Sequence, residues 1–190
     1  MPVKKTKGGR MMDSGKYNVI LADPPWKYRT DMVTGHKSLD HYSSMSNNEL
    51  KSMDVCNICD EQCVLFMWTT TPNLDIAIEV GRAWGFDYKQ VAFVWDKVNP
   101  CCGNYTMPQV ELVLVFRPKK GRLPKRSKTN VRQVIVEKKR EHSRKPEYVQ
   151  DMIDLMYPDA KKIELFARRT RPGWDVWGNE TTKFDKEVIK

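Results

Sequence analysis

Apolar runs of strand length alternate with amphipathic segments of helix length along this chain. Apolar residues at helical spacing predict helices over residues 72–84 and 146–156. Ser46 and Glu49 have the spacing of a capping box, which predicts a further helix running towards Val55. A near-continuous apolar run at residues 17–22 predicts a strand buried on both faces. Further strands are predicted at residues 63–69, 88–95, 110–116, 131–136 and 162–167. The alternation predicts a single three-layer α/β domain with a mainly parallel sheet.

The first predicted strand ends in Asp23-Pro24-Pro25-Trp26, which carries the most specific chemistry of the chain. Ligands of open α/β sheets bind at the carboxyl ends of the strands. An exocyclic amine is a poor nucleophile, so an enzyme that methylates it needs acceptors for its hydrogens. Asp23 can supply one acceptor and the Pro24 carbonyl a second, while Trp26 offers a flat face for a base. The alternative is structural, because Asp-Pro-Pro also makes a stable turn after a strand.

Further segments, in order along the chain, resemble the DPPW-type N6-adenine methyltransferases. This family includes the catalytic subunit of the eukaryotic messenger-RNA adenosine methyltransferase and many microbial and phage DNA enzymes. The resemblance extends from about residue 17 to residue 180, and its segments beyond the first motif are HYSSMS at 41–46, LFMWT at 65–69, AWGF at 83–86, WDK at 95–97, GNY at 103–105, Glu111, HSRKPE at 142–147, ELFAR at 164–168 and GWDVWGNE at 173–180. Their order and coverage identify the chain as a member of the family.

The resemblance implies a Rossmann-like class I methyltransferase fold with permuted motif order and S-adenosylmethionine as cofactor. It places Lys145 at the methionine carboxylate, Arg168 near the ribose, and Asn179 and Glu180 at the ribose hydroxyls or adenine. Glu180 departs from relatives with glutamine there, and a carboxylate cannot donate hydrogen bonds. Glu111 matches a family position but can equally be a structural acid within a strand. The other cofactor positions implied are Ala22, Asp23, Ser143 and Phe166, and the catalytic ones are Asp23, Pro24, Pro25 and Trp26.

Charge adds an expectation about the partner. The net charge is +9 and the pI is near 9.3, with the excess concentrated in residues 4–10 and 117–145. Basic clusters give sequence-independent affinity for nucleic acid, although such a surface can also serve solubility alone. DNA is the expected partner and RNA the alternative. We expect Trp26 or Tyr28 to stack on a flipped base, and basic contacts to come from Lys97, Arg117, Lys119, Lys120 and Arg122.

The length of 190 residues fits one domain, with a basic arm at 1–16, a methyltransferase domain at 17–181 and a tail at 182–190. No run of about 18 apolar residues and no apolar signal core occur. Five cysteines do not suggest a secreted disulfide framework. We therefore expect a cytoplasmic protein of a microbial or phage-infected cell, without membrane contact.

The sequence is compatible with a monomer, a dimer or a complex with a second specificity subunit. The chain has no room for a large target-recognition domain. Without a second subunit, the loops at 27–45 and 99–130 would have to read the target sequence.

Cysteine patterns suggest other chemistries. Cys56, Cys59 and Cys63 could hold zinc or an iron–sulfur cluster, but no second cysteine pair or paired histidine completes a zinc site. Their spacing also fits one face of a helix, where cysteine packs as a small hydrophobe, so we expect no metal. Pro100-Cys101 resembles the nucleophile of cytosine-C5 methyltransferases, a chemistry that an amine does not need.

These observations favour direct, in-line methylation of the N6 amine of adenine in DNA. RNA adenosine is the alternative substrate. A catalytically inert nucleic-acid-binding subunit of a methyltransferase complex is the alternative from a different class, and the retained Asp23 motif argues against it.

Overall fold

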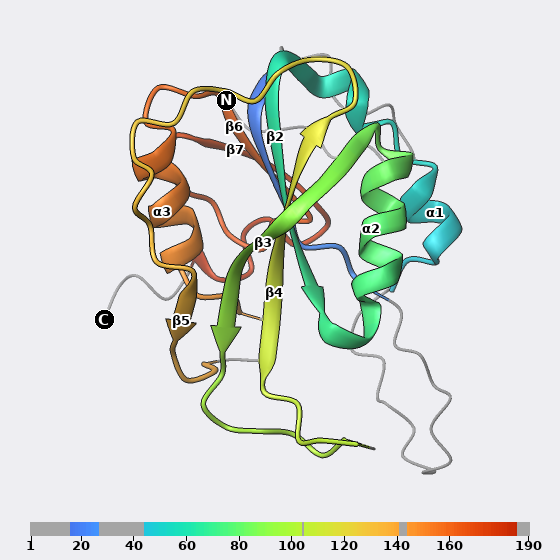
Figure 1. Ribbon diagram of the computed structural model, residues 1–190, viewed down its shortest axis with the longest axis vertical. Coiled ribbons are helices and arrows are strands. Elements are labelled where there is room, and N and C mark those ends of the chain that lie inside the picture. The colour runs from blue at the N-terminus through green and yellow to red at the C-terminus, as the bar shows by residue number, and fades with distance from the viewer. Residues whose placement is uncertain (1–15, 27–43, 104, 141–143, 186–190) are drawn as a thin grey trace.

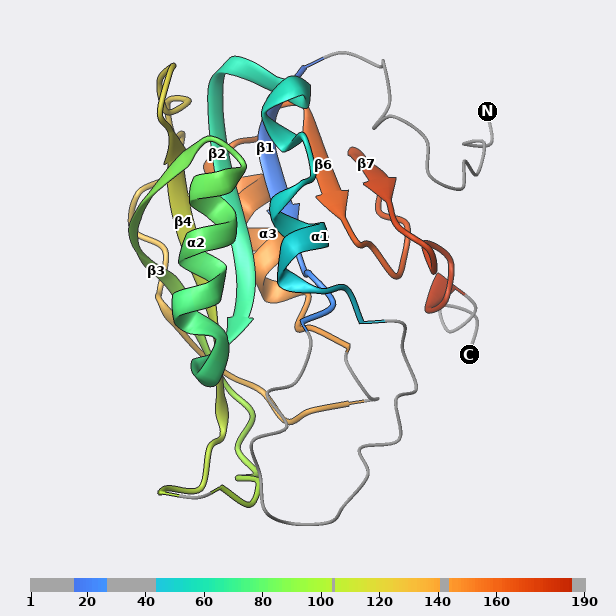
Figure 2. The same ribbon diagram turned by 90° about the vertical axis from the view of Figure 1, so that its right-hand side faces the viewer.

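A seven-stranded mixed sheet forms the middle layer of the described structure (Figure 1). The computed structural model describes residues 16–26, 44–103, 105–140 and 144–185. The helices with α geometry are α1 (Asn47–Lys51), α2 (Leu74–Ala83) and α3 (Tyr148–Met156). The strands are β1 (Tyr17–Ala22), β2 (Cys59–Thr70), β3 (Phe86–Asp96), β4 (Val110–Pro118), β5 (Val134–Val136), β6 (Lys162–Leu165) and β7 (Trp174–Trp177). Helices α1 and α2 cover one face of the sheet, and α3 covers the other (Figure 2).

The strand order is β5-β3-β4-β2-β1-β6-β7. Strand β4 is antiparallel to both β2 and β3, whereas the remaining neighbours pair in parallel. Within the described sheet, β4 alone is therefore reversed. The connection between β3 and β4 contains no helix in its described residues, 97–103 and 105–109, and does not make the crossover that a parallel pair requires. The predicted three-layer fold with a mainly parallel sheet is confirmed.

Both faces of the sheet are buried, which explains why its central strands are apolar at almost every position. In β1, Ile20 and Ala22 belong to the core beneath α1 and α2, while Val19 and Leu21 belong to the core beneath α3. Alternate side chains of a strand point to opposite faces. A single apolar run thus contributes to both cores.

The first helix is shorter than its sequence pattern predicts. The Ser46 hydroxyl accepts the Glu49 N–H at 3.3 Å, and the Glu49 carboxylate accepts the Ser46 N–H at 2.7 Å, so the capping box is confirmed. Helix α1 nevertheless ends at Lys51, and a 3₁₀ helix follows at Val55–Ile58. The Ser52 hydroxyl donates to the Glu49 carbonyl at 2.8 Å, which satisfies one of the carbonyls left open at the helix end.

The other predicted elements are present with shifted ends. Strands β2, β3 and β4 extend beyond their predicted limits, β5 covers only part of residues 131–136, and β6 ends two residues early. Helix α3 begins at Tyr148 rather than at Pro146. Strand β7 was not predicted, because it is short and carries a charged residue, Asp175. The Asp175 carboxylate accepts the Tyr17 hydroxyl at 2.6 Å, which accounts for an acid in this strand.

The expectation that Cys56, Cys59 and Cys63 share a helical face is wrong. Cys56 is exposed in the 3₁₀ helix, while Cys59 and Cys63 lie in β2 and are buried beneath α1 and α2. A hydrogen bond with Cys59, together with burial, raises the pKa of the Cys63 thiol. The two thiols in β2 therefore pack as small hydrophobes.

Parts of the expected domain plan fall outside the described residues. These parts are residues 1–15 of the arm, 27–43 of the first loop and 186–190 of the tail. None of the helices in the described ranges is long and apolar enough to cross a membrane.

Replacing the cap, Ser46→Ala, should lower the free energy of unfolding by about 1 kcal/mol, because an N–H at the start of α1 loses its acceptor. Equilibrium unfolding in urea measures this difference. Ser127→Ala is the control, at an exposed serine that bonds through its backbone N–H. Equal midpoints for Ser46→Ala and the unsubstituted protein would show that the cap contributes nothing.

Candidate active site

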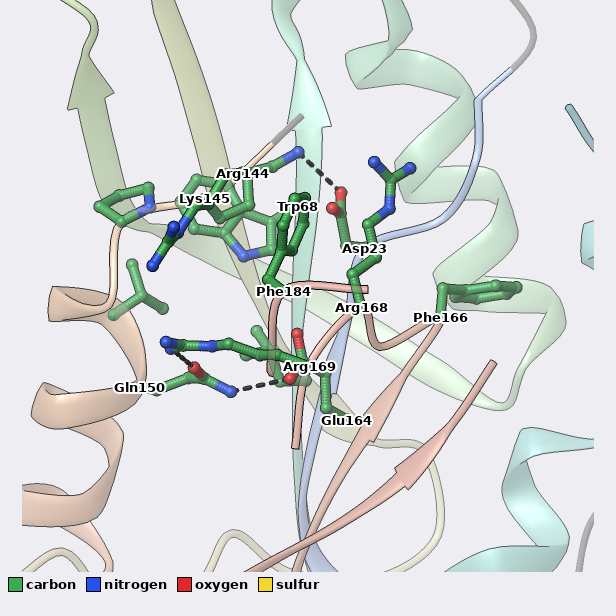
Figure 3. A pocket seen from close by; sticks show the side chains of 13 residues that line it. Asp23, Trp68, Arg144, Lys145, Gln150, Glu164, Phe166, Arg168, Arg169 and Phe184 are labelled. Atoms are coloured by element: carbon green, nitrogen blue, oxygen red, sulfur yellow. Dashed lines mark hydrogen bonds and ion pairs between the residues drawn. The ribbon is translucent and has the colours of Figure 1, made fainter. Parts of the chain in front are cut away.

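Asp23 lies at the carboxyl edge of the sheet, directly after β1. Strands β2 and β6 flank β1 in parallel and end at the same edge. The Asp23 N–H donates to the carbonyl of Leu165, the last residue of β6, at 3.3 Å. The Asp23 side chain, 14% exposed, lines a pocket (Figure 3). The motif is thus tied to two neighbouring strands at the edge where ligands bind.

The turn from Asp23 to Trp26 has little freedom. The Trp26 N–H donates to the Pro24 carbonyl at 2.8 Å, and the Pro25 carbonyl accepts the Met45 N–H at 3.1 Å. The indole N–H of Trp26 donates to the carbonyl of Trp68 in β2 at 3.0 Å. A carbonyl oxygen has two lone pairs, so Pro24 retains one for a further donor. The motif is therefore a structural turn that also leaves an acceptor beside Asp23.

Lys145 is the counter-ion of Asp23. Its ammonium lies 2.9 Å from Asp23 Oδ1 and 3.3 Å from Glu111 Oε2, and 5.5 Å from the centre of the Trp68 ring. Burial alone would lower the pKa of Lys145, but the two carboxylates outweigh burial and hold this pKa above its ordinary value. Lys145 is therefore fully charged at neutral pH.

Glu111 in β4 links this ion pair to a second lysine. Its carboxylate lies 3.4 Å from the ammonium of Lys97, which directly follows β3. Burial alone would raise the pKa of Glu111, but Lys145 and Lys97 hold it below its ordinary value. Asp23, Lys145, Glu111 and Lys97 thus form a chain of alternating charges, which we call the charge chain. Glu111 is both a structural acid and a member of the site.

The pocket beside Asp23 lies between β1, β6 and the start of α3. Its empty volume, counted together with the solvent at its open mouth, is about 450 Å³. Leu21, Trp68 and Val149 supply apolar lining. The charged lining residues are the acids Asp23 and Glu164 and the cations Arg144, Lys145, Arg168 and Arg169.

Glu164 is held by an amide rather than by a cation. The Gln150 side-chain amide donates to the Glu164 carboxylate at 2.8 Å and accepts a hydrogen bond from Arg169. Burial, together with the negative charge of Asp23, raises the pKa of Glu164 to about 7. Near neutral pH, this carboxyl is therefore divided between its protonated and ionised forms.

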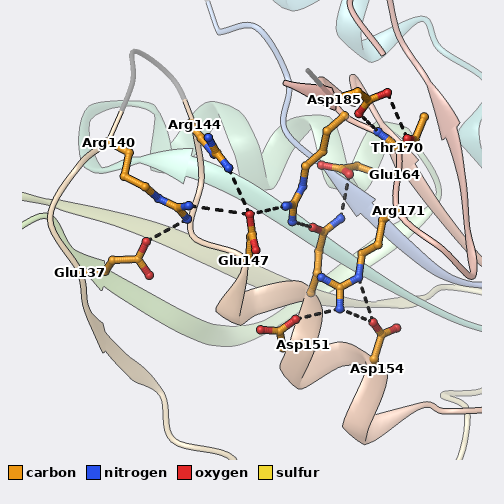
Figure 4. A network of polar contacts seen from close by, with 12 residues as sticks. Glu137, Arg140, Arg144, Glu147, Asp151, Asp154, Glu164, Thr170, Arg171 and Asp185 are labelled. Carbon is orange, nitrogen blue, oxygen red and sulfur yellow. Dashed lines mark hydrogen bonds and ion pairs between the residues drawn. The ribbon is translucent and has the colours of Figure 1, made fainter. Parts of the chain in front are cut away.

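Ion pairs beside the pocket fix α3 against the segment after β6 (Figure 4). Arg169 lies 2.6 Å from the Glu147 carboxylate. Arg171 lies 2.8 Å from the Asp151 carboxylate and 2.7 Å from that of Asp154. These contacts hold the start of α3, and with it the site lysine, against the end of β6.

Phe166 follows β6 with φ at 62°, a left-handed conformation that is uncommon for a residue other than glycine. Its ring packs edge-on against Trp177, with centroids 5.3 Å apart. A Cβ atom at Gly178 would lie 3.0 Å from the backbone of Ala167. Glycine at 178 therefore lets the end of β7 approach the strained turn at Phe166. Such strained turns concentrate at ligand sites.

The structure brings several expected cofactor residues together, because Asp23, Lys145, Phe166 and Arg168 all line the pocket. Ala22 is buried at the end of β1. Glu180 lies 3.9 Å from Arg168, beside the pocket. Asn179 is exposed and is not a lining residue. Tyr28 and Ser143 lie outside the described residues.

Four of the five basic residues expected to contact nucleic acid are not brought to this edge. Because β4 is reversed, its end lies at the opposite edge of the sheet, where β2 begins. There the backbone N–H of Arg122 donates to the Glu61 carbonyl at 2.9 Å, and the Arg122 carbonyl accepts the Cys63 N–H at 3.0 Å. The residues separated from Asp23 in this way are Arg117, Lys119, Lys120 and Arg122. Of the five expected basic contacts, Lys97 lies at the site edge.

Some pocket residues were missed from the sequence, namely Trp68, Arg144, Gln150, Glu164, Arg169 and Phe184. Trp68 and Glu164 lie inside segments that carried the family resemblance, yet no role was assigned to them. Gln150 had a signal in the sequence, since it stands three residues before Ile153 on the predicted helix and so shares the face of an apolar residue; the structure buries it to 4% exposure. A polar residue on the buried side of a helix usually has a specific partner.

Most of the chain matches a known protein family. A profile of the MT-A70 family matches residues 17–180. The chain belongs to the MT-A70 family.

Relatives of the chain include proteins of similar and of much greater length. Type II methyltransferase M.MunI of a Mycoplasma species is 43% identical over 183 residues, which cover 87% of this chain and 78% of that protein. A putative N(6)-adenosine-methyltransferase MT-A70-like protein of Medicago truncatula is 30% identical over 182 residues, 90% of this chain and 27% of its own. Human N(6)-adenine-specific methyltransferase METTL4 is 26% identical over 186 residues, 88% of this chain and 38% of its own.

MT-A70 membership confirms the family resemblance that the Asp23 motif and the later segments carried. It also confirms the expected class of enzyme, an adenine-N6 methyltransferase. The matched range begins at the first residue of β1 and ends three residues after β7. It therefore contains the whole sheet and every member of the charge chain.

A Glu164→Gln variant should gain stability over the unsubstituted protein as the pH rises. The pKa of Glu164 is about 7 when folded and about 4.3 when unfolded. Between these values the folded protein binds more protons than the unfolded chain, so its stability falls with pH, and glutamine removes this effect. The difference in free energy of unfolding, variant minus unsubstituted, should be larger at pH 8 than at pH 5 in urea titrations.

Glu147→Gln is the matched control for this pH effect. Burial would raise the pKa of Glu147, but Arg169, Arg144 and Arg140 hold it below its ordinary value. Its stability difference should therefore stay constant between pH 5 and pH 8. A constant difference for Glu164→Gln as well would contradict the raised pKa.

Proposed function

We propose that this protein transfers a methyl group from S-adenosylmethionine to the N6 amine of adenine in DNA. MT-A70 membership supplies the class of reaction. The observation that carries the proposal is the Asp23–Lys145 ion pair, which lines the pocket at the carboxyl edge of the sheet. This pair offers partners both to the charged end of the cofactor and to the target amine.

The residues of the pocket fit the charges of S-adenosylmethionine. Its methionine end carries an ammonium and a carboxylate on the same carbon. Asp23 can pair with the ammonium and Lys145 with the carboxylate, so exchanging their direct ion pair for this zwitterion leaves neither side chain uncompensated. Lys145 also retains Glu111. Arg168 and Glu180 offer donors and acceptors to the ribose hydroxyls.

When bound, the cofactor supplies a methyl group activated by its sulfonium sulfur. The protein orients the amine and stabilises the positive charge that develops on N6 as the new bond forms. Asp23 supplies a negative charge and an acceptor, and the remaining lone pair of the Pro24 carbonyl supplies a second acceptor. The N6 proton can leave to water after transfer, so a strong general base is not needed.

Trp26 supports the placement of the target base. Its indole N–H donates to the Trp68 carbonyl, which fixes the plane of a half-buried ring three residues after Asp23. A flipped adenine stacked on such a ring gains about 1–3 kcal/mol. Because the ring is already fixed, little side-chain freedom is lost when the base binds.

The relatives favour DNA over RNA as the substrate. Type II methyltransferases modify DNA, and M.MunI matches this chain over most of both lengths, whereas the N(6)-adenosine-methyltransferase relative from Medicago truncatula is matched over only 27% of its own. The net charge of +9 indicates a polyanionic partner, a property that DNA and RNA share. A microbial DNA substrate also implies action in the cytoplasm.

Incubation with labelled S-adenosylmethionine should place N6-methyladenine in duplex DNA. Single-stranded DNA and RNA are assayed in parallel, and the products are digested to nucleosides. Asp23→Ala should lower the rate about 100-fold or more, because the developing charge loses its main partner. Asp87→Ala is the control, since that acid pairs with Arg117 away from the pocket. Product on RNA alone would show that RNA, and not DNA, is the substrate. No product on any substrate would overturn the proposal.

A Lys145→Met variant should bind S-adenosylhomocysteine about 10- to 100-fold more weakly, because the methionine carboxylate loses a charged partner worth about 1.5–3 kcal/mol. Isothermal titration calorimetry measures the affinity, and thermal unfolding checks that the variant is folded. Lys119→Met removes the same charge at the opposite edge, where Lys119 donates to the Arg82 carbonyl. Equal affinities for both variants would exclude Lys145 from the cofactor site.

A further inference from the structure

The connection between β3 and β4 forms a hairpin that projects past the carboxyl edge of the sheet (Figure 1). We call Val98–Gly103 and Tyr105–Gln109 the β3–β4 hairpin. At its base, the Lys97 N–H donates to the Gln109 carbonyl at 2.9 Å. Further out, the Cys101 N–H donates to the Pro108 carbonyl at 2.9 Å. The two sides are therefore joined at two levels.

Asp96, the last residue of β3, stiffens this hairpin. Its Oδ1 atom accepts the Val98 N–H at 2.7 Å and the Gln109 side-chain amide at 2.9 Å. These bonds hold Val98 at φ 67°, a conformation that a β-branched residue rarely adopts. A Cβ atom at Gly103 would lie 2.3 Å from the Thr106 carbonyl oxygen. The hairpin is thus built around one conformation.

Tyr105 lies beyond the Cys101–Pro108 hydrogen bond, in the outer part of the hairpin, and is 100% exposed. Met107 and Val98 are 64% and 38% exposed. Aromatic side chains usually bury most of their surface, so a stiff support for an exposed ring indicates that something covers the ring when the protein acts. The residues from Val98 to Gln109 include no acid that would repel phosphates.

The base of the hairpin is directly connected to the catalytic residues. Lys97 contacts Glu111 at 3.4 Å, Glu111 contacts Lys145 at 3.3 Å, and Lys145 contacts Asp23 at 2.9 Å. Tyr105 is four residues from Gln109, and four residues of extended chain span at most about 14 Å. A duplex with one base at Asp23 would therefore lie within reach of the Tyr105 ring.

We propose that Tyr105 inserts into the base stack of duplex DNA, at the position that the flipped adenine leaves. This inference rests on the proposed function, because only a base taken out of the duplex can reach Asp23. Unstacking a base costs free energy, and an inserted ring restores stacking contacts on both neighbours. Tyr105 is then a binding residue that holds the duplex open.

A protein partner fits the hairpin less well than DNA does. A stable protein interface buries about 800 Å² on each partner. The large apolar side chains that the described hairpin exposes are one tyrosine, one methionine and one valine on a narrow stem. A single ring at the end of a stiff, uncharged stem has the shape for insertion between base pairs.

The test uses a duplex that the unsubstituted protein methylates. On this duplex, kcat/KM of a Tyr105→Ala variant should be about 10- to 100-fold lower than that of the unsubstituted protein, because the gap is left unfilled. Tyr105→Phe should retain the duplex rate, since its ring still stacks. Leu123→Ala is the control for loss of an exposed apolar side chain, near the opposite edge of the sheet, and should leave the rate unchanged.

Rescue separates insertion from a merely structural role. The same adenine in a single strand, or opposite an abasic site, costs less to unstack, so Tyr105→Ala should there match the unsubstituted protein within about twofold. An equal loss on every substrate, no loss on the duplex, or a changed oligomeric state in light scattering would each overturn insertion. If the unsubstituted protein methylates no DNA, the proposed function fails instead.

Discussion

The charge chain of Asp23, Lys145, Glu111 and Lys97 is the interaction on which the site depends. Its members come from the ends of β1 and β3, the start of β4 and the segment before α3. Half-buried charges are costly unless each has a partner of opposite sign. Alternating signs give both central members two partners. Four segments distant in sequence are thereby held at one edge, with an acid facing the pocket.

The reversed direction of β4 makes this arrangement possible. Since β4 begins where β1 and β2 end, Glu111 arrives beside Lys145. A β4 parallel to its neighbours would place Glu111 at the opposite edge and leave Lys145 with one carboxylate. The same reversal carries Arg117 and the basic residues after it away from the site. The direction of β4 thus places Glu111 at the site and four cationic residues at the opposite edge of the sheet.

The sequence predicted what short-range patterns encode. The strand before Asp23, the capping box at Ser46 and the helix leading to Met156 are confirmed, because each depends on neighbours along the chain. The direction of β4 depends on how a connection folds, and periodicity carries no information about it. The bridge by Gln150 between Glu164 and Arg169 joins two elements. Its geometry therefore needed the fold, although the helical spacing of Gln150 from Ile153 could have been noticed.

The connection between β3 and β4 has a double consequence. A crossover helix would have made β4 parallel and would have covered part of the sheet. A hairpin instead turns β4 back and leaves its own residues beyond the carboxyl edge. In a fold with no separate target-recognition domain in the described ranges, such an edge offers a place from which residues can reach a large substrate. The connection that completes the charge chain through Glu111 also extends the protein outwards from Asp23, so the charge chain and the proposed contact with DNA share one structural origin.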